Sequence, residues 1–320
     1  MKLLNILVLL VLVGLCCGQY MERLSRRKRE SCFPESTGTT PFIKEIFLGR
    51  CLELQTETAI PNACPQSPVN CTLLWDVFHD AIAYKDPCAI PLDAYREFIA
   101  AVPHQLPADK SMFWSGTSYI VHEYTEAAND LLTLEDTLLG YMVDGLQWCS
   151  STDASSTGLN YQECPDFWQE GCAVASTAFY TATSSAIGRQ ATGVITVMLD
   201  ATRTDGAYRN DSFFAKYEFP NMDPEKVTRG DIILVNRLGN PIVETCGTGS
   251  VAVLERLFTE KGIEWTCTDN DERVYHVQCS KDPTHTECIT PADVTGSSAT
   301  SRPSLIILAM ILVCMVAELM

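Results

Sequence analysis

Two kinds of hydrophobic pattern divide the central part of the chain. In the amino half, apolar residues recur at spacings of three and four, which is typical of helices with one buried face. The segments with this pattern are 73–84, 92–101, 118–131 and 134–143. The carboxyl half contains β-branched apolar runs at 193–199 and 231–235, typical of buried parallel strands, and a helical pattern at 248–261. The prediction is a mainly helical amino half and an α/β carboxyl half.

The chain begins with an apolar segment of a different kind. Residues 3–15 are mostly apolar and follow a lysine, but the run is too short to cross a bilayer. This order predicts a secretory signal peptide over residues 1–18. The four adjacent cations at 26–29 then resemble a protease-processing site, so residues 19–29 are predicted to be a propeptide; a solvated basic patch is the alternative.

The chain ends with small residues, a short polar stretch and an apolar tail at 305–320. This is the order of a signal for attachment of a GPI anchor, predicted here for 297–320, with Ser297 as the attachment residue or Gly296 or Ser298 in its place. A single transmembrane anchor is the alternative, but sixteen residues with a glutamate near the end make a poor span. The expected location is the extracellular face of the plasma membrane, with a lipid anchor.

The chain has 15 cysteines, which are too many for an ordinary cytosolic enzyme and indicate an oxidising compartment. Loss of Cys16, Cys17 and Cys314 with the terminal segments leaves twelve, and six disulfides are the simplest arrangement for that even number. These cysteines form no CxxC pair, and the histidines form no HExxH motif. No metal site is therefore expected.

The charge of the chain excludes one class of partner. There are 40 acidic residues against 23 Lys and Arg, a formal net charge of −17, and the chain becomes more acidic once its terminal segments are removed. A nucleic-acid-binding protein needs the opposite balance. Anionic lipid would also be repelled, so attachment to a membrane has to come from the anchor.

Acidic residues concentrate in the segment 133–149. Thr133 and Asp136 have the spacing of a capping box, which predicts a helix start with Glu135 and Asp136 in the first turn, where the helix dipole favours carboxylates. Capping accounts for Asp136, but it does not account for Glu135 and Asp144 as well. These acids are therefore candidates for a binding site.

The same segment reads TLEDTLLGY at 133–141 and continues to Asp144 and Trp148-Cys149. It resembles the signature of the ADP-ribosyl cyclase/NAD glycohydrolase family. Three more segments are similar to family motifs: FWS at 113–115, YQECPD at 161–166 and SFFAKYE at 212–218. The resemblance covers about residues 45–290.

The resemblance implies an α/β fold with two lobes. Because the helical lobe and the sheet lobe are separate, the arrangement can also be described as α+β. A helical, disulfide-stapled lobe would comprise 30–109 and 133–190, and a smaller lobe with a short parallel sheet flanked by helices would comprise 110–132 and 191–290. It also implies five disulfides: Cys51–Cys71, Cys88–Cys172, Cys149–Cys164, Cys246–Cys267 and Cys279–Cys288. Cys32 and Cys64 are left over and could pair with each other.

Members of this family cleave the nicotinamide–ribose bond of NAD through an oxocarbenium-like centre, which water or the substrate's own adenine then captures. The resemblance implies that Glu218 is the catalytic carboxylate. The residues that it implies for substrate binding are Trp114, Ser115, Glu135, Asp144, Tyr180, Ser184, Phe213 and Phe214. NAD is then a substrate, with NADP as a second possibility, and no cofactor is expected. A homodimer is compatible with the resemblance.

Two positions depart from the family pattern. Tyr180 stands where relatives have a second tryptophan in the pocket, although a shift of one residue in the alignment would place Phe179 there. Phe213 stands where relatives that favour hydrolysis have a smaller polar residue, and an aromatic ring there could stack on adenine and favour cyclisation. Few cations lie near the motifs, so the substrate phosphates are expected to contact hydroxyls and backbone N–H groups of Ser115, Ser184 and the 212–214 loop.

Alternatives remain for individual residues and for the whole protein. Glu218 could be an exposed strand residue in an alternating aromatic pattern. Asn70 and Asn210 lie in glycosylation sequons, the first beside a cysteine. The main functional alternative is a GPI-anchored surface protein that binds or adheres with little turnover. The joint presence of Glu218, Trp114 and the acids near 135–144 favours the enzyme.

Overall fold

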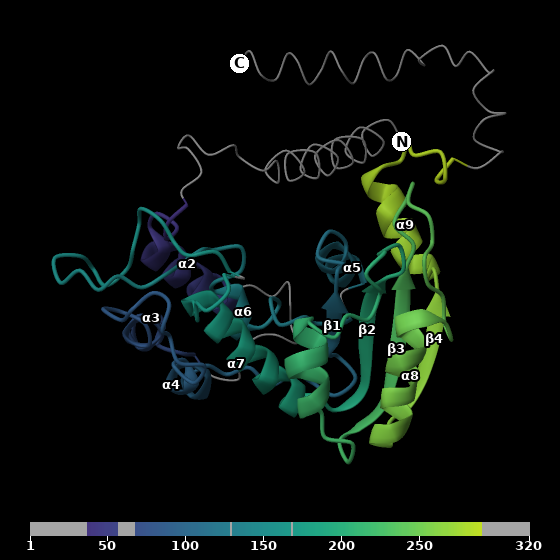
Figure 1. Cartoon of the computed structure of the whole chain (residues 1–320), viewed down its shortest axis with the longest axis horizontal. Helices are drawn as coiled ribbons and strands as arrows, with labels where there is room; N and C mark the ends of the chain where they lie inside the picture. The colour runs from purple at the N-terminus through teal and green to yellow at the C-terminus, as the bar shows by residue number, and fades with distance from the viewer. Residues whose placement is uncertain (1–36, 57–67, 129, 168, 290–320) are drawn as a thin grey trace, which may run out of the picture. The chain divides into compact units, whose positions relative to one another are not determined.

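Four parallel strands form the single named sheet in the part of the chain that the computed structural model describes, residues 37–56, 68–128, 130–167 and 169–289. The strands are β1 (Met112–Ser115), β2 (Gly193–Asp200), β3 (Val227–Val235) and β4 (Glu264–Asp269), and they pair in that order (Figure 1). The predicted strands at 193–199 and 231–235 are confirmed as β2 and β3. Because all pairs are parallel, the carboxyl ends of the strands share one edge of the sheet.

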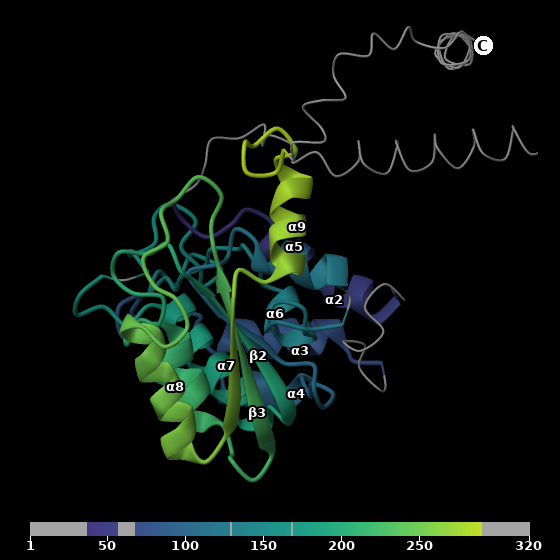
Figure 2. The same ribbon diagram turned by 90° about the vertical axis from the view of Figure 1, so that its right-hand side faces the viewer.

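Helices cover both faces of this sheet. They are α5 (Val121–Ala128), α8 (Gly249–Lys261) and α9 (Glu272–Lys281). Alternate strand residues explain the two faces: Met198 and Ile233 pack with α5 and α9, whereas Ile232 packs in the cluster that contains α8. Figure 2 shows α8 on the other side of the sheet from α5 and α9. The fold is therefore α/β in this part of the chain, as the sequence predicts.

The remaining α-helices of the described residues pack around an aromatic core. They are α2 (Ile43–Thr56), α3 (Cys71–Asp80), α4 (Arg96–Ala101), α6 (Leu138–Tyr141) and α7 (Ala175–Gln190). Phe78 lies at the centre of this core, with the rings of Tyr95 and Trp148 at 5.5 and 5.6 Å. The indole Nε1 of Trp148 donates to the Tyr95 hydroxyl at 2.8 Å, so this buried polar pair is satisfied.

The expected helix over 134–143 is wrong in its start and its length. Asp136 accepts hydrogen bonds from the N–H and the hydroxyl of Thr133 at 2.8 and 3.0 Å, which closes a separate turn. The helix α6 begins only at Leu138, where Thr137 is the N-cap residue and its hydroxyl accepts from the N–H of Gly140. Glu135 therefore lies in a turn before the helix and not in its first turn.

Five disulfides join described residues, and they are the five pairs that the resemblance implies. Cys51–Cys71 links α2 to α3, and Cys88–Cys172 joins segments 84 residues apart. The others are Cys149–Cys164, Cys246–Cys267 and Cys279–Cys288. Cys32 and Cys64 lie outside the described residues, as do the predicted signal peptide, propeptide and GPI signal. The division into two lobes stays a prediction.

None of the helices in the described ranges has the length and apolar character that a membrane span requires.

Candidate active site

A cavity of about 460 Å³ lies at the carboxyl end of β1 and reaches α7 and the segment that follows β2. Its size is that of a small-molecule site, and ligands of parallel sheets bind at this edge. Of the nine residues that the resemblance implies, eight line the cavity: Trp114, Ser115, Glu135, Asp144, Tyr180, Ser184, Phe213 and Glu218. Segments far apart in sequence thus converge on one site.

Glu218 is held at the end of a short π-helix, η1 (Phe214–Glu218), where the N–H of Phe219 donates to the carbonyl of Phe214. Its side chain is buried, with 9% exposed, and the hydroxyl of Ser184 donates to its Oε1 at 2.9 Å. Burial raises the pKa of Glu218 to about 8. The hydrogen bond from Ser184 lowers this pKa, and the negative charge of Glu135 raises it further. The alternative that Glu218 is an exposed strand residue is wrong.

The helix α7 fixes the position of η1 through a very close contact. Ser184 and Tyr180 lie one turn apart on α7, so both side chains face the cavity. One turn beyond Ser184, Gly188 meets the backbone of Glu218, and a Cβ at this glycine would collide with the carbonyl of Glu218. Only glycine lets the two elements approach this closely.

Two acids line the cavity together with Glu218. Burial raises the pKa of Glu135, and the charge of His122 opposes that rise. The Oε2 atom of Glu135 is buried and has no hydrogen-bond partner among the described residues, so a ligand can reach a polar group that the protein leaves unsatisfied. Asp144 is exposed, and Arg50 donates to its backbone carbonyl at 2.6 Å.

Aromatic rings form another part of the cavity lining. The ring of Tyr180 lies 6.2 Å from that of Phe213, and Phe167 lies 6.2 and 6.1 Å from these two rings. Phe179 is fully buried in the aromatic core, so Tyr180 is the residue of this pair that lines the cavity. Trp114 contacts the ring of His122 edge-on at 5.9 Å.

The side chain of Phe214 does not line the cavity, so its ring cannot stack on a substrate there, and a contact from its backbone N–H stays a prediction. It is fully buried against Phe113 at 5.9 Å, Tyr208 at 6.2 Å and Phe219 at 5.9 Å. Phe213 and Phe214 are adjacent in a helical turn and therefore point in different directions. One ring meets the cavity and the other fills the core.

The lining residues that were not among those expected include His122, Phe167 and Arg209. His122 lies within the helical pattern predicted over 118–131, but nothing in that pattern distinguishes it as a site residue. No pattern marks Phe167 or Arg209. Few cations were expected near the motifs, and Arg209 is one that the path of its loop brings to the cavity.

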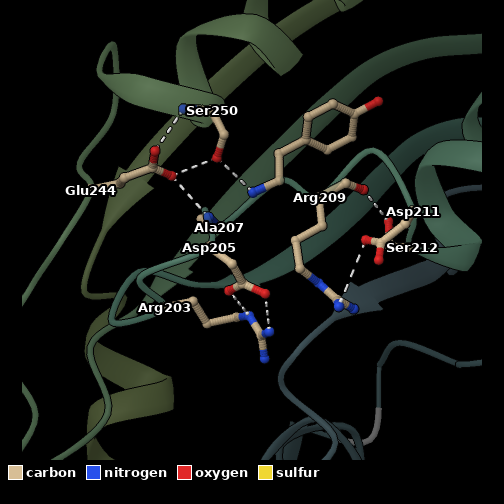
Figure 3. A network of polar contacts seen from close by, with 9 residues as sticks. Arg203, Asp205, Ala207, Arg209, Asp211, Ser212, Glu244 and Ser250 are labelled. Atoms are coloured by element: carbon tan, nitrogen blue, oxygen red, sulfur yellow. Dashed lines mark hydrogen bonds and ion pairs between the residues drawn. The ribbon is translucent and has the colours of Figure 1, made fainter.

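The loop that carries Arg209 is fixed by a carboxylate on the next segment (Figure 3). Glu244 accepts from the backbone N–H of Ala207 at 2.8 Å and from the N–H and hydroxyl of Ser250 at 2.7 and 2.5 Å. Burial alone would raise the pKa of Glu244, but these hydrogen bonds lower it below its ordinary value. A Cβ at Gly249 would overlap the Glu244 carboxylate, which explains the glycine at the start of α8.

One group of potential metal ligands occurs among the described residues, and it consists of Cys246, Glu255 and Cys267. Both sulfurs belong to a disulfide, so neither is a thiolate that could bind a metal ion. Glu255 accepts from the N–H of Gly247 at 2.9 Å. This group is structural.

The site can be compared with known proteins. The family model described as ADP-ribosyl cyclase matches residues 40–288. The ADP-ribosyl cyclase/cyclic ADP-ribose hydrolase of Aplysia californica is 38% identical over 256 residues, which cover 79% of this chain and 89% of that protein. The human ADP-ribosyl cyclase/cyclic ADP-ribose hydrolase 2 is 36% identical over 271 residues, 84% of this chain and 81% of that protein.

Solved structures agree with the sequence comparisons. The Aplysia cyclase complexed with substrate NGD and product cGDPR has a TM-score of 0.72 and 37% identity, over 79% of this chain and 98% of that chain. A structure of CD38, described as evidence for a covalent enzyme–substrate complex, has a TM-score of 0.67 and 30% identity, over 76% of this chain and 97% of that chain. The chain belongs to the ADP-ribosyl cyclase family.

Proposed function

We propose that the protein cleaves the nicotinamide–ribose bond of NAD and releases nicotinamide together with cyclic ADP-ribose, ADP-ribose or both. The observation that carries this proposal is the buried Glu218 carboxyl in a cavity lined by aromatic rings and two further acids. The names of the relatives, and the substrate and product in the Aplysia cyclase structure, support it. NAD is the substrate in this proposal, and NADP carries the same reactive bond.

In the first step the nicotinamide–ribose bond breaks, and its electron pair leaves with nicotinamide. The ribose carbon becomes electron-poor, and the Glu218 carboxylate stabilises it or bonds to it covalently. The Ser184 hydroxyl, 2.9 Å from Oε1, holds the carboxylate in one orientation. Burial strengthens the attraction between the carboxylate and the developing positive charge.

In the second step a nucleophile attacks the same carbon. Water gives ADP-ribose and a proton, whereas a ring nitrogen of the substrate's adenine gives cyclic ADP-ribose. The nicotinamide side of the cavity would consist of Trp114, which offers an aromatic surface, and of Glu135 and Asp144. A carboxyl group can donate to the carboxamide oxygen when protonated or accept from the amide N–H when ionised.

The test is to incubate the secreted, oxidised protein with NAD and to separate the products by chromatography. Nicotinamide together with cyclic or linear ADP-ribose is the expected result. A folded sample that binds NAD and releases no nicotinamide contradicts the proposal. It favours instead the alternative of a surface protein that binds or adheres without turnover.

The reaction is proposed to take place outside the cell, on a GPI-anchored protein. The terminal segments and the five disulfides of the described residues support this location. Both sequon asparagines are exposed, and Asn70 also caps α3 through its side-chain oxygen. Treatment of intact cells with a phospholipase that cleaves phosphatidylinositol should release the enzyme; retention on the cells contradicts the anchor.

Phe213 is proposed to favour cyclisation by stacking on the adenine of a folded substrate. Phe213→Thr should lower the ratio of cyclic to linear product by about threefold or more, since an aromatic contact contributes roughly 0.5–1.5 kcal/mol. Nicotinamide release should continue, because Glu218 is unchanged. Product ratios measured on NAD check this prediction. An unchanged ratio would show that Phe213 does not influence which product forms.

A further inference from the structure

The cavity combines an excess of acids with one strong cation. Glu135, Asp144 and Glu218 line it, and Arg209 is the one Lys or Arg among its described lining residues. The whole chain has a formal net charge of −17. A substrate that carries a diphosphate therefore meets a repulsive field, which a local cation can offset.

The guanidinium of Arg209 is incompletely paired. Its Nε is buried and has no hydrogen-bond partner among the described residues. Its Nη1 forms an ion pair with Asp211 at 3.7 Å, a separation longer than a hydrogen bond, and the Asp211 side chain is 72% exposed (Figure 3). Arg203 in the same loop differs, because Asp205 accepts from its Nε and Nη2 at 2.8 and 2.5 Å (Figure 3). A buried donor without a partner is costly, so the Nε of Arg209 is available to a bound anion.

The backbone of Arg209 is held firmly beside the catalytic segment. The N–H and the hydroxyl of Ser212 both donate to the Arg209 carbonyl, at 3.1 and 2.8 Å. The Ser212 hydroxyl also accepts from the N–H of Ala215 at 3.1 Å, within η1. On the other side, Tyr208 donates its N–H to the Ser250 hydroxyl at 2.9 Å. Arg209 is thus fixed relative to the helix that carries Glu218.

We propose that Arg209 binds the diphosphate of the dinucleotide substrate and so sets the position of the ribose relative to Glu218. This inference rests on the proposed function, because it takes the substrate to be NAD. A guanidinium suits the role, since its N–H groups can bind two phosphate oxygens at once. The Ser115 hydroxyl, which lines the same cavity and is buried without a partner among the described residues, is available to a further phosphate oxygen.

The experiment measures equilibrium binding of ADP-ribose and of nicotinamide by calorimetry, and the KM for NAD and for NADP, on the wild type and on Arg209→Gln. The matched control is Arg256→Gln, which removes the same charge from an exposed position on α8. Arg209→Gln should weaken ADP-ribose binding by about tenfold to a hundredfold, the value of one or two charge-assisted hydrogen bonds. Nicotinamide binding should not change, and Arg256→Gln should bind both compounds as the wild type does.

Three results overturn the proposal. ADP-ribose binding that is unchanged in Arg209→Gln shows that the diphosphate does not use this residue. Equal losses for ADP-ribose and nicotinamide show a general distortion of the cavity. A loss restricted to NADP, with NAD and ADP-ribose unaffected, assigns Arg209 to the 2′-phosphate instead.

Measurements of binding and of turnover test the role of Arg209 and the proposed reaction separately. ADP-ribose binding needs no catalysis, so a wild type that binds ADP-ribose but releases no nicotinamide from NAD refutes the proposed reaction and leaves the Arg209 result valid. In an active enzyme, Arg209→Gln should raise the KM for NAD more than it lowers kcat. Arg209→Lys should restore part of the ADP-ribose affinity, because it retains the charge and loses the second donor.

Discussion

At the residue scale, the protonation of Glu218 is determined by the cavity around it. Burial raises its pKa from 4.5 to about 8, although Ser184 donates a hydrogen bond to it. The carboxyl group is therefore largely protonated at pH values below about 8. The nicotinamide ring of NAD is cationic and favours the ionised form when it binds. Substrate binding thus prepares the carboxylate that the reaction needs.

The raised pKa of Glu218 also affects stability, with a definite sign. The folded state keeps a proton that the unfolded chain loses above about pH 4.5, so the stability contributed by this group falls as the pH rises from about 4.5 through about 8. Glu218→Gln removes this loss and should raise the Tm at pH 8 by roughly 2–4 °C for each kcal/mol of stability recovered, and by less at pH 5. Calorimetry at the two pH values checks this. Glu260→Gln, at an exposed position on α8, is the control, and an equal Tm change at both pH values for Glu218→Gln contradicts the account.

The residues of the site differ in how well the sequence predicts them. Glu218, Trp114 and Glu135 are identified by their spacing relative to family motifs, and all three line the cavity. Phe213 and Phe214 cannot be separated in this way, because only the geometry of the π-helix decides which ring faces the cavity. Arg209 is missed because a loop has no period, and its position depends on the distant Glu244.

At the element scale, burial decides what the hydrophobic pattern can predict. β2 is buried along most of its length and is evident as a continuous apolar run. β4 is exposed at almost every position and contains no such run, so it is not predicted. The π-helix η1 is also missed, because five residues are too few to display a period. The elements that hold the site are thus less visible in the sequence than those that form the core.

The contact between α7 and η1 gives a prediction for Gly188. A Cβ at Gly188 would collide with the carbonyl of Glu218, so Gly188→Ala should push η1 away from α7. The expected cost is about 1–3 kcal/mol of stability, with a clear fall in kcat as Glu218 moves away from Ser184. Denaturant unfolding and NAD turnover measure the two effects.

Gly49→Ala is the matched control for this prediction. Gly49 lies in the helix α2, and a Cβ there would meet no atom within 4 Å. Alanine has the higher helix propensity, so this substitution should leave kcat unchanged and stabilise the protein by up to about 1 kcal/mol. If both variants behave alike, the close approach of α7 to η1 does not position Glu218.

At the scale of the whole molecule, the disulfides differ in the length of chain that they close. Cys88 and Cys172 are 84 residues apart, whereas Cys279 and Cys288 are only 9 apart. A longer closed loop restricts the unfolded chain more strongly. The paired substitution of Cys88 and Cys172 by alanine should cost about 2 kcal/mol more than that of Cys279 and Cys288. Guanidinium unfolding of the two double variants checks this, and equal midpoints contradict it.

The overall architecture is predicted more completely than its details. The helical and α/β halves follow from periodicity, because a domain must bury one face of each element. The start of α6 is not predicted, since Thr133 and Thr137 both offer a capping hydroxyl and only the tertiary structure chooses between them. Long-range packing therefore decides what local sequence leaves open.

The most direct test of the account is nicotinamide release from NAD by the wild type, Glu218→Gln and Glu260→Gln. In the proposed reaction the buried carboxylate of Glu218 stabilises the electron-poor ribose carbon. Glu218→Gln should therefore lose turnover by at least about a hundredfold while it stays folded, and Glu260→Gln should match the wild type. Nicotinamide release by Glu218→Gln at a rate near that of the wild type would contradict the claim, because the reaction would then not depend on this carboxylate.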